Sequence, residues 1–384
     1  MSYYFGVEIE LIGQPHNVQD PLLRRLYYEK FATSLNRRGL SAIADRLDGS
    51  RYRKHPEHYD KWWITRDGSL GDPSYPRIPL EAVSPTLWTL GSWEHDVDRF
   101  WYAWDDVFQK PDASSLCGSH IHVSPSPTKA FSLSQLKDIA IGVIFYEPHI
   151  RDLLPECRQR SKYCCRNTLH SEKLRIMGSD DGGKLRAVCS YISQEIHDEE
   201  KLRDFMQKSS TPSKDRYVLW NFDNILPGRS GSIEFRGGHG LRGPAATRMW
   251  VSFVVAFIHL CIKEDSYSWR RFQVYGYSPE QFQRYSTIQF WKDLTEAATF
   301  INVRQHLPSS WSDMMMLFRQ DCYEERGSDV GRGSDDNDSL KSKGDYDASD
   351  SESLDYKPSD SKPSDSKPSD SNYCCCSICR KGYV

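Results

Sequence analysis

Three strand-like segments carry polar, metal-competent side chains at positions i and i+2, with an apolar residue between them: Glu8-Ile9-Glu10, His120-Ile121-His122 and Glu234-Phe235-Arg236. Alternate residues of a strand point to the same face, so each polar pair projects together while its apolar neighbours enter a core. If the three strands share one sheet, one face gathers three carboxylates, two imidazoles and a guanidinium. Repulsion between ionised carboxylates makes that arrangement unfavourable, and divalent metal is the natural compensation.

Each pair taken alone has an ordinary explanation. A Glu-x-Glu on a strand is typical of a solvated face, and a His-x-His occurs both at metal sites and on plain surfaces. A Glu-Phe-Arg is typical of a cross-strand salt bridge. Here all three pairs are flanked by apolar residues in register, including Val7, Leu11, Val123 and Ile233. This co-occurrence favours one shared metal site over three separate surface features.

The surrounding elements predict an α+β fold. Strand-like segments lie at 3–11, 61–66, 80–84, 118–124, 216–222 and 230–236. Helical patterns cover 20–38, 93–108, 133–154, 187–206 and most of the chain from Pro244 to Phe318. Because these elements do not alternate in a regular βαβ order, we expect a curved, mainly antiparallel sheet with helices packed outside.

A change in composition after Glu325 separates a folded body, residues 1–325, from a tail, residues 326–384. The tail is rich in Ser, Asp, Lys, Gly and Pro and repeats KPSDS three times between 357 and 371. Such a segment buries too little apolar surface to offset its ordering entropy, so we expect it to be disordered. Four thiols near its end either serve no site, bind a soft metal or accept acyl chains: Cys374, Cys375, Cys376 and Cys379.

Charge and apolar patterning argue against several classes of partner. The 50 basic and 53 acidic residues nearly cancel, which gives no electrostatic reason to expect nucleic-acid or membrane binding. The longest apolar stretch, 249–262, is shorter than the roughly 20 residues of a membrane span and is expected to be a buried helix. No secretory signal is recognisable, and eleven cysteines without a disulfide framework indicate a reduced, cytoplasmic location.

Six motifs in fixed order connect the chain to a known family. They are FGVEIEL, RDGSL, EAVSP, CGSHIHVS, RYVLWNF and GSIEFRGG, and they span residues from about 4 to 240. This series resembles the putative amidoligase family, which belongs to the carboxylate–amine ligases with a catalytic fold of the glutamine-synthetase and glutamate–cysteine-ligase type. The resemblance implies an ATP-dependent enzyme that forms C–N bonds, with its nucleotide and metals on the concave face of the sheet.

The resemblance also implies a role for each matching residue. Two divalent ions, Mg²⁺ or Mn²⁺, would be bound. The ion nearer the reacting carboxylate would be held by Glu10 and Glu81, and the ion that bridges the phosphates of ATP by Glu8, His120 and Glu234. His122 and Arg236 would contact the phosphates and neutralise charge during transfer.

Further implied roles concern the substrates. Arg216 and Asn221 in RYVLWNF would bind phosphate or a substrate carboxylate, and Asp67 in RDGS would shape the site or orient the amine. The stretch 158–214 matches the family poorly and is either a substrate lid or a solvated surface. Arg166 is the cation there that we expect to meet an anion, out of an excess that comprises Arg158, Arg160, Lys162, Arg166, Arg175 and Arg186.

The implied chemistry joins a small-molecule carboxylate to an amine, on amino acids or small peptides. A substrate carboxylate attacks the γ-phosphorus of ATP to give an acyl phosphate, and an amine then displaces the phosphate while a nearby carboxylate takes its proton. The Gly-x-x-x-x-Gly-Lys match at 178–184 lacks the Ser or Thr that follows it in a P-loop, and the Gly-x-Gly-x-x-Gly match at 238–243 is not part of a βαβ unit, so we expect metals and basic side chains to hold the phosphates.

Two other functions stay open. A metal-dependent hydrolase could use the same side chains, although a hydrolase barrel would open with its His-x-His, which here lies on a middle strand. A non-catalytic binding or scaffold descendant would use the tail as its interaction segment, although the cluster of carboxylates is intact. Cys117, beside the His-x-His, is expected to be a small buried residue and not a nucleophile.

Overall fold

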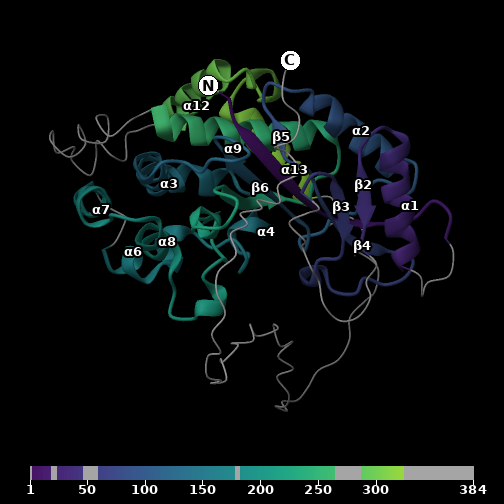
Figure 1. The fold of residues 1–384 in the computed structure, drawn as a ribbon, viewed down its shortest axis with the longest axis horizontal. Coiled ribbons are helices and arrows are strands. Elements are labelled where there is room, and N and C mark those ends of the chain that lie inside the picture. The colour runs from purple at the N-terminus through teal and green to yellow at the C-terminus, as the bar shows by residue number, and fades with distance from the viewer. Residues whose placement is uncertain (1, 19–23, 46–58, 178–181, 264–286, 324–384) are drawn as a thin grey trace, which may run out of the picture. The chain divides into compact units, whose positions relative to one another are not determined.

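The strand of the Glu-x-Glu pair, β1, lies in the middle of a single sheet. The strand order is β2-β3-β4-β1-β6-β8-β7, and β5 pairs with the start of β1. Every pairing is antiparallel except that of β2 with β3, so the sheet is open and mostly antiparallel, as predicted. In Figure 1, β1 is the long purple strand near the centre. The strands are β1 (Tyr4–Gly13), β2 (Ala42–Ala44), β3 (Trp62–Thr65), β4 (Ile78–Val83), β5 (Leu87–Trp88), β6 (Gly118–Ser124), β7 (Trp220–Asn221) and β8 (Ile233–His239).

The computed structural model describes the ranges 2–18, 24–45, 59–177, 182–263 and 287–323. The chain divides into two units, 1–332 and 333–384, and all described residues belong to the first. The predicted disorder of the tail and the predicted roles of its four cysteines therefore lie outside the described residues.

Strand register puts the predicted polar pairs on one face of the sheet. Between β1 and its neighbours, Glu8 lies opposite His120 and Glu10 lies opposite Glu81. Between β6 and β8, His122 lies opposite Glu234. Directly opposed residues of an antiparallel pair point to the same side, so all these side chains share a face.

The other face of the sheet is apolar and lies against helices. Phe5 packs edge-on against Trp93 of α2, and Phe235 contacts Trp250 and Phe253 of α9. Both α3 and α12 pack against α9, while α1 packs beside β2 and β3. The helices on this side are α1 (Arg24–Arg37), α2 (Trp93–Asp105), α3 (Leu133–Leu153), α9 (Pro244–Lys263), α12 (Thr287–Phe300) and α13 (Trp311–Tyr323).

Helix α9 is the most apolar helix of the core. By length and composition alone it could cross a membrane, but 78% of its apolar window is buried inside the protein. It extends the apolar stretch predicted at 249–262 to 20 residues. The helix is therefore buried, as predicted, and its apolar character is explained by its place between the sheet and the outer helices.

Small helices fill the segment between α3 and β7. They are α4 (Glu156–Gln159), α5 (Asn167–His170), α6 (Glu172–Met177), α7 (Gly182–Glu195) and α8 (Glu199–Gln207). The single helix predicted for 187–206 is wrong, because Asp198 has an extended backbone and caps α8 by accepting from the Lys201 N–H at 2.7 Å. The strand predicted at 216–222 shortens to the two residues of β7.

Candidate active site

Glu8 lies between the two histidines of the His-x-His strand. The Nδ1 atom of His120 is 3.0 Å from one carboxylate oxygen of Glu8, and the Nε2 atom of His122 is 3.2 Å from the other. The same two rings face Glu234, whose Oε1 is 3.5 Å from His120 Nδ1 and 3.9 Å from His122 Nε2. Two carboxylates and two imidazoles thus meet in one place.

Glu234 is held in this position by hydrogen bonds from both sides. Asn221 of β7 donates its side-chain N–H to Oε2 at 2.8 Å, and Arg236 donates Nη1–H to Oε1 at 2.6 Å. Burial alone would raise the pKa of the Glu234 carboxyl, but the charges of Arg236, His122 and His120 outweigh it and lower the pKa well below its usual range. The Glu234 carboxylate therefore stays ionised inside the protein.

Glu10 and Glu81 form the second acidic part of the site. They are cross-strand partners on β1 and β4, and their exposed fractions are only 5% and 2%. Glu10 accepts a hydrogen bond from the backbone N–H of Gly118 at 2.6 Å, and its other oxygen lies 3.8 Å from His120 Nε2. His120 thus stands between the two acidic parts, with one ring nitrogen toward each.

The donor set suits a divalent cation. Glu8, His122 and Glu234 each offer a ligand atom, and these atoms all lie within 4.8 Å of one another. His120, the imidazole predicted for this group, meets the same two carboxylates from the neighbouring position on the strand. Hard carboxylate oxygens joined by an imidazole are ligands that Mg²⁺ and Mn²⁺ accept.

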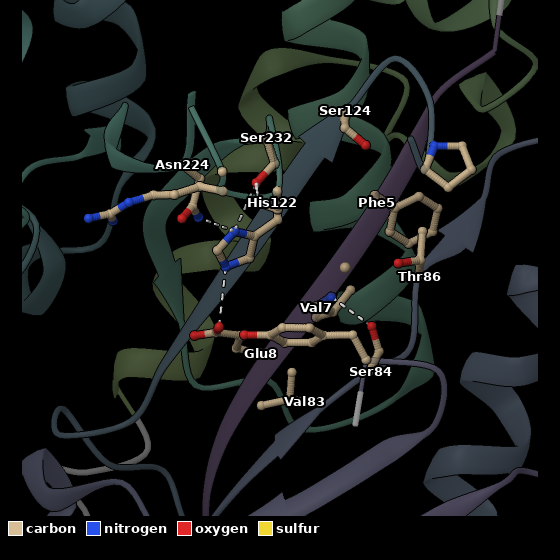
Figure 2. A pocket seen from close by; sticks show the side chains of 16 residues that line it. Phe5, Val7, Glu8, Val83, Ser84, Thr86, His122, Ser124, Asn224 and Ser232 are labelled. Carbon is tan, nitrogen blue, oxygen red and sulfur yellow. Dashed lines mark hydrogen bonds and ion pairs between the residues drawn. The ribbon is translucent and has the colours of Figure 1, made fainter. Parts of the chain in front are cut away.

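A pocket of about 500 Å³ adjoins this cluster at Glu8 and His122. Figure 2 shows the His122 ring pointing toward Glu8, with Asn224 and Ser232 on its other side. Their side chains lie 3.4 and 3.5 Å from His122 Nδ1. The floor includes Phe5, Val7 and Val83, and the polar lining includes Ser84, Thr86, Ser124 and Arg229. The pocket has the size and mixed lining typical of a small-molecule site.

The sequence of the chain matches one protein family. The model of a family described as putative amidoligase enzyme matches residues 2–258. The chain belongs to this amidoligase family. The match includes all seven residues of the cluster described above: Glu8, Glu10, Glu81, His120, His122, Glu234 and Arg236. No curated protein matches the chain.

Among the other residues that the amidoligase resemblance singled out, Asn221 lies at the site, and Asp67 lies in a turn that packs near the end of β1. The side-chain amide of Asn221 donates a hydrogen bond to Glu234, as described above. Asp67 caps a 3₁₀ turn by accepting from the Ser69 N–H at 2.5 Å, and the turn ends in Leu70, which packs on Cys117 near the end of β1. The RDGSL loop thus supports the strands that carry Glu10 and Gly118.

Two predicted anion-binding residues have neighbours outside the cluster. Arg216 is exposed, with its guanidinium 5.5 Å from the ring centre of Tyr217. Arg166 lies near Glu147, a buried residue of α3. Burial raises the pKa of the Glu147 carboxyl, and the charge of Arg166 opposes this effect. Within the described part of the chain, neither arginine forms an ion pair with a carboxylate of the cluster. Their proposed contacts with an anion stay predictions.

Cys117 and His239 are buried residues with packing contacts, although both lie in or near the amidoligase motifs. Burial and the charge of Glu10 raise the pKa of the Cys117 thiol far above neutrality, so it is not a ready nucleophile. His239 points into the core, where Trp250 donates to its Nδ1 at 3.0 Å and the ring of Phe318 packs beside it.

Sequence reasoning gave no particular role to two residues that the structure places beside Glu10. Gly118 bonds to Glu10 through its backbone, and Arg158 of α4 is 4% exposed and donates to the backbone oxygen of Arg236 at 2.6 Å. Gly118 is the second residue of the CGSHIHVS motif, which was a usable signal. Arg158 is one of twelve Lys and Arg residues in the segment 158–214, and no local pattern distinguishes it from the others.

Proposed function

We propose that this amidoligase joins a carboxylate to an amine in an ATP-dependent reaction that passes through an acyl phosphate. One observation carries the proposal. His120 faces Glu8 and Glu234 with one ring nitrogen and Glu10 with the other, so two sets of acidic ligands adjoin beside a pocket of small-molecule size. The substrates are a small-molecule carboxylate and an amine, and we place the reaction in the reduced cytoplasm because the six described cysteines are present as thiols.

Two Mg²⁺ or Mn²⁺ ions suit the donor set. Glu8, Glu234 and an imidazole would hold one ion, and Glu10 with Glu81 would hold the other. Bound ions of this kind supply positive charge that offsets the charge of the phosphates during transfer. For the imidazole we favour His120. The Asn224 amide lies on the Nδ1 side of His122 and, as a donor, favours a proton on Nε2, which suits a hydrogen bond to phosphate better than a metal ligand.

The first step forms a bond between a carboxylate oxygen of the acid and the γ-phosphorus of ATP, and the bond to the ADP oxygen breaks. Arg236 is suited to neutralise charge at this point, because the carboxylates of Glu234, Glu8 and Glu10 raise the pKa of its guanidinium even though burial opposes this. In the second step the amine nitrogen attacks the acyl carbon and phosphate leaves. A carboxylate of the cluster takes the proton of the amine.

Ligand-dependent stabilisation tests this function. We expect Mg²⁺ with ATP to raise the Tm of the purified protein, and a metabolite extract incubated with both to yield masses equal to an acid plus an amine minus water. Glu8→Gln should lose the stabilisation and the products, whereas Glu156→Gln, at a carboxylate with 60% side-chain exposure, should keep both. Metal binding without any response to ATP would favour a hydrolase. Indifference to metal and ATP would favour a scaffold.

A further inference from the structure

Gly6 stands in a middle strand of the sheet without a structural reason for being glycine. Its backbone lies outside the left-handed region that favours glycine. A Cβ atom built on Gly6 would meet, among the described residues, only the Oγ of Ser84 within 4 Å, at an ordinary contact distance of 3.9 Å. Glycine inside a strand is less favourable than most other residues, and it often marks a place where a ligand comes close to the backbone. A ligand therefore explains this glycine better than folding does.

The missing side chain leaves a space on the face of the sheet that carries the cluster. Gly6 lies opposite His122 across β1 and β6, and Glu8 follows two residues later on β1. A side chain at position 6 would therefore point to the same side as Glu8 and His122. Gly6 lines the pocket of about 500 Å³ that adjoins these two residues, so any larger residue at this position would project into the pocket.

Polar side chains bound this space on both sides of β1. Figure 2 shows Ser84 and Thr86 on one side of the strand, with His122 and Ser232 on the other. Ser84 is held in place, because its hydroxyl accepts from the backbone N–H of Val7 at 2.8 Å and donates to a backbone oxygen. A flat floor with hydroxyl and amide groups around it suits a ligand with apolar faces and polar edges. These groups belong to Ser84, Thr86, Ser124, Asn224, Ser230 and Ser232.

We propose that the nucleoside part of ATP lies against Gly6, and that the absence of a side chain at this position admits it. The inference rests on the proposed function and adds the place of the nucleotide. The pocket reaches Glu8 and His122, which the proposed function assigns to the phosphates, and its lining includes neither Glu10 nor Glu81, where the acid would react. A ligand that extends from the phosphates into this pocket is the sugar and base of the nucleotide, and not the acid or the amine.

Replacing Gly6 by Val tests the inference, with the Tm of the full chain as the readout. The probes are Mn²⁺ alone, Mg²⁺ with ATP, and Mg²⁺ with inorganic tripolyphosphate. Without ligand, Gly6→Val should have a Tm equal to or above that of the wild type, because valine is the better strand residue. Its responses to Mn²⁺ and to tripolyphosphate should match those of the wild type. For ATP it should require about tenfold or more of the nucleotide for the same shift, because valine occupies the space of the nucleoside.

Two further variants separate this effect from a general effect of replacing glycine. Gly243→Val is the matched control, because a Cβ atom there would meet no described atom within 4 Å and the residue is not part of the pocket lining. It should respond to every probe as the wild type does. Gly6→Ala adds a smaller group and should weaken the response to ATP less than Gly6→Val does.

Several outcomes would overturn the inference. One is an ATP response of Gly6→Val equal to that of the wild type, and another is a loss of its Mn²⁺ or tripolyphosphate response together with the ATP response. A lower Tm of both Gly6 variants without ligand would give the glycine a structural role instead. Normal ATP binding by Gly6→Val without product formation would place the acid or the amine against Gly6. A wild type indifferent to ATP would overturn the proposed function as well, whereas the other outcomes leave that function standing.

Discussion

At the scale of single residues, Glu10 and Glu81 are two carboxylate residues directly opposite each other in the register of the sheet. They face each other across β1 and β4, and both are buried. Like charges directly opposite on a sheet destabilise it, and burial strengthens the repulsion because little water screens it. A bound cation would turn this repulsion into attraction, so mutation of either residue should affect stability more with metal than without it.

Replacing Glu10 by Gln tests this reasoning. The change keeps the shape and an acceptor for the Gly118 N–H but removes one of the opposed charges. Without divalent cation we expect the free energy of unfolding to change by less than about 0.5 kcal/mol, because the relief of one opposed charge is offset by the lost attraction between Glu10 and Arg236. With Mn²⁺ the stabilisation seen in the wild type should shrink. Urea unfolding with EDTA and with Mn²⁺ measures both effects, and an undiminished Mn²⁺ stabilisation of Glu10→Gln would contradict a role for Glu10 in holding the ion.

Glu147 gives a second prediction at this scale, away from the cluster. Burial raises the pKa of its carboxyl to about 7, although Thr168 donates to it through its hydroxyl and through its backbone N–H at 3.2 Å. Between about pH 4.5 and 7 the folded protein keeps a proton that the unfolded chain has released. Stability from this group is therefore present at low pH and is lost as pH rises, by about 3 kcal/mol in all.

The measurement is the difference between the wild type and Glu147→Gln in urea unfolding at pH 5 and at pH 8. Other titrating groups affect both proteins alike, so the difference isolates Glu147. We expect the wild type to lose more stability than the variant between these two pH values. Parallel losses in the two proteins would show that Glu147 has an ordinary pKa.

At the scale of elements, period-two alternation was enough to predict that each polar pair shares a face. It could not predict register, and register decides that Glu10 meets Glu81 and that His122 meets Glu234. The burial of Arg158 could not be predicted from the sequence, because it depends on the packing of α4 against β8, which is far away along the chain. The sequence did not predict that the helix expected at 187–206 is interrupted at Asp198. Helical periodicity continues through this residue, and only its extended backbone shows that it caps the start of α8.

The packing of α3 on α9 gives a prediction at this scale. A Cβ atom at Gly142 of α3 would lie 2.3 Å from the Sγ of Cys261 on α9, which is closer than two such atoms can approach. Gly142→Ala should therefore force the helices apart and lower the free energy of unfolding by about 1–3 kcal/mol. Chemical unfolding measures this loss. Combining Gly142→Ala with Cys261→Ala should recover part of it, and full additivity of the two losses would contradict direct contact.

At the scale of the whole molecule, the core behind the site extends past the part of the chain that matches the family. The match ends at 258, yet Phe318 of α13 stacks on Trp250 of α9 with ring centres 4.3 Å apart. Trp250 in turn contacts Phe235, the apolar residue between Glu234 and Arg236. The helices that follow the matched region therefore support the strand that carries two residues of the cluster.

Two truncations separate this support from the contribution of the tail. Deleting 333–384 removes the second unit, which contains no residue of the cluster, so Tm and ATP-dependent product formation should stay at wild-type values. Ending the chain at Ser310 also removes α13 and exposes Trp250, so Tm should fall by several degrees because about 2 kcal/mol or more of apolar packing is lost. Differential scanning fluorimetry of both truncations decides the matter. A lower Tm after the first deletion would mean that the tail stabilises the catalytic body. An unchanged Tm after the second would mean that α13 does not stabilise the strand that carries the cluster.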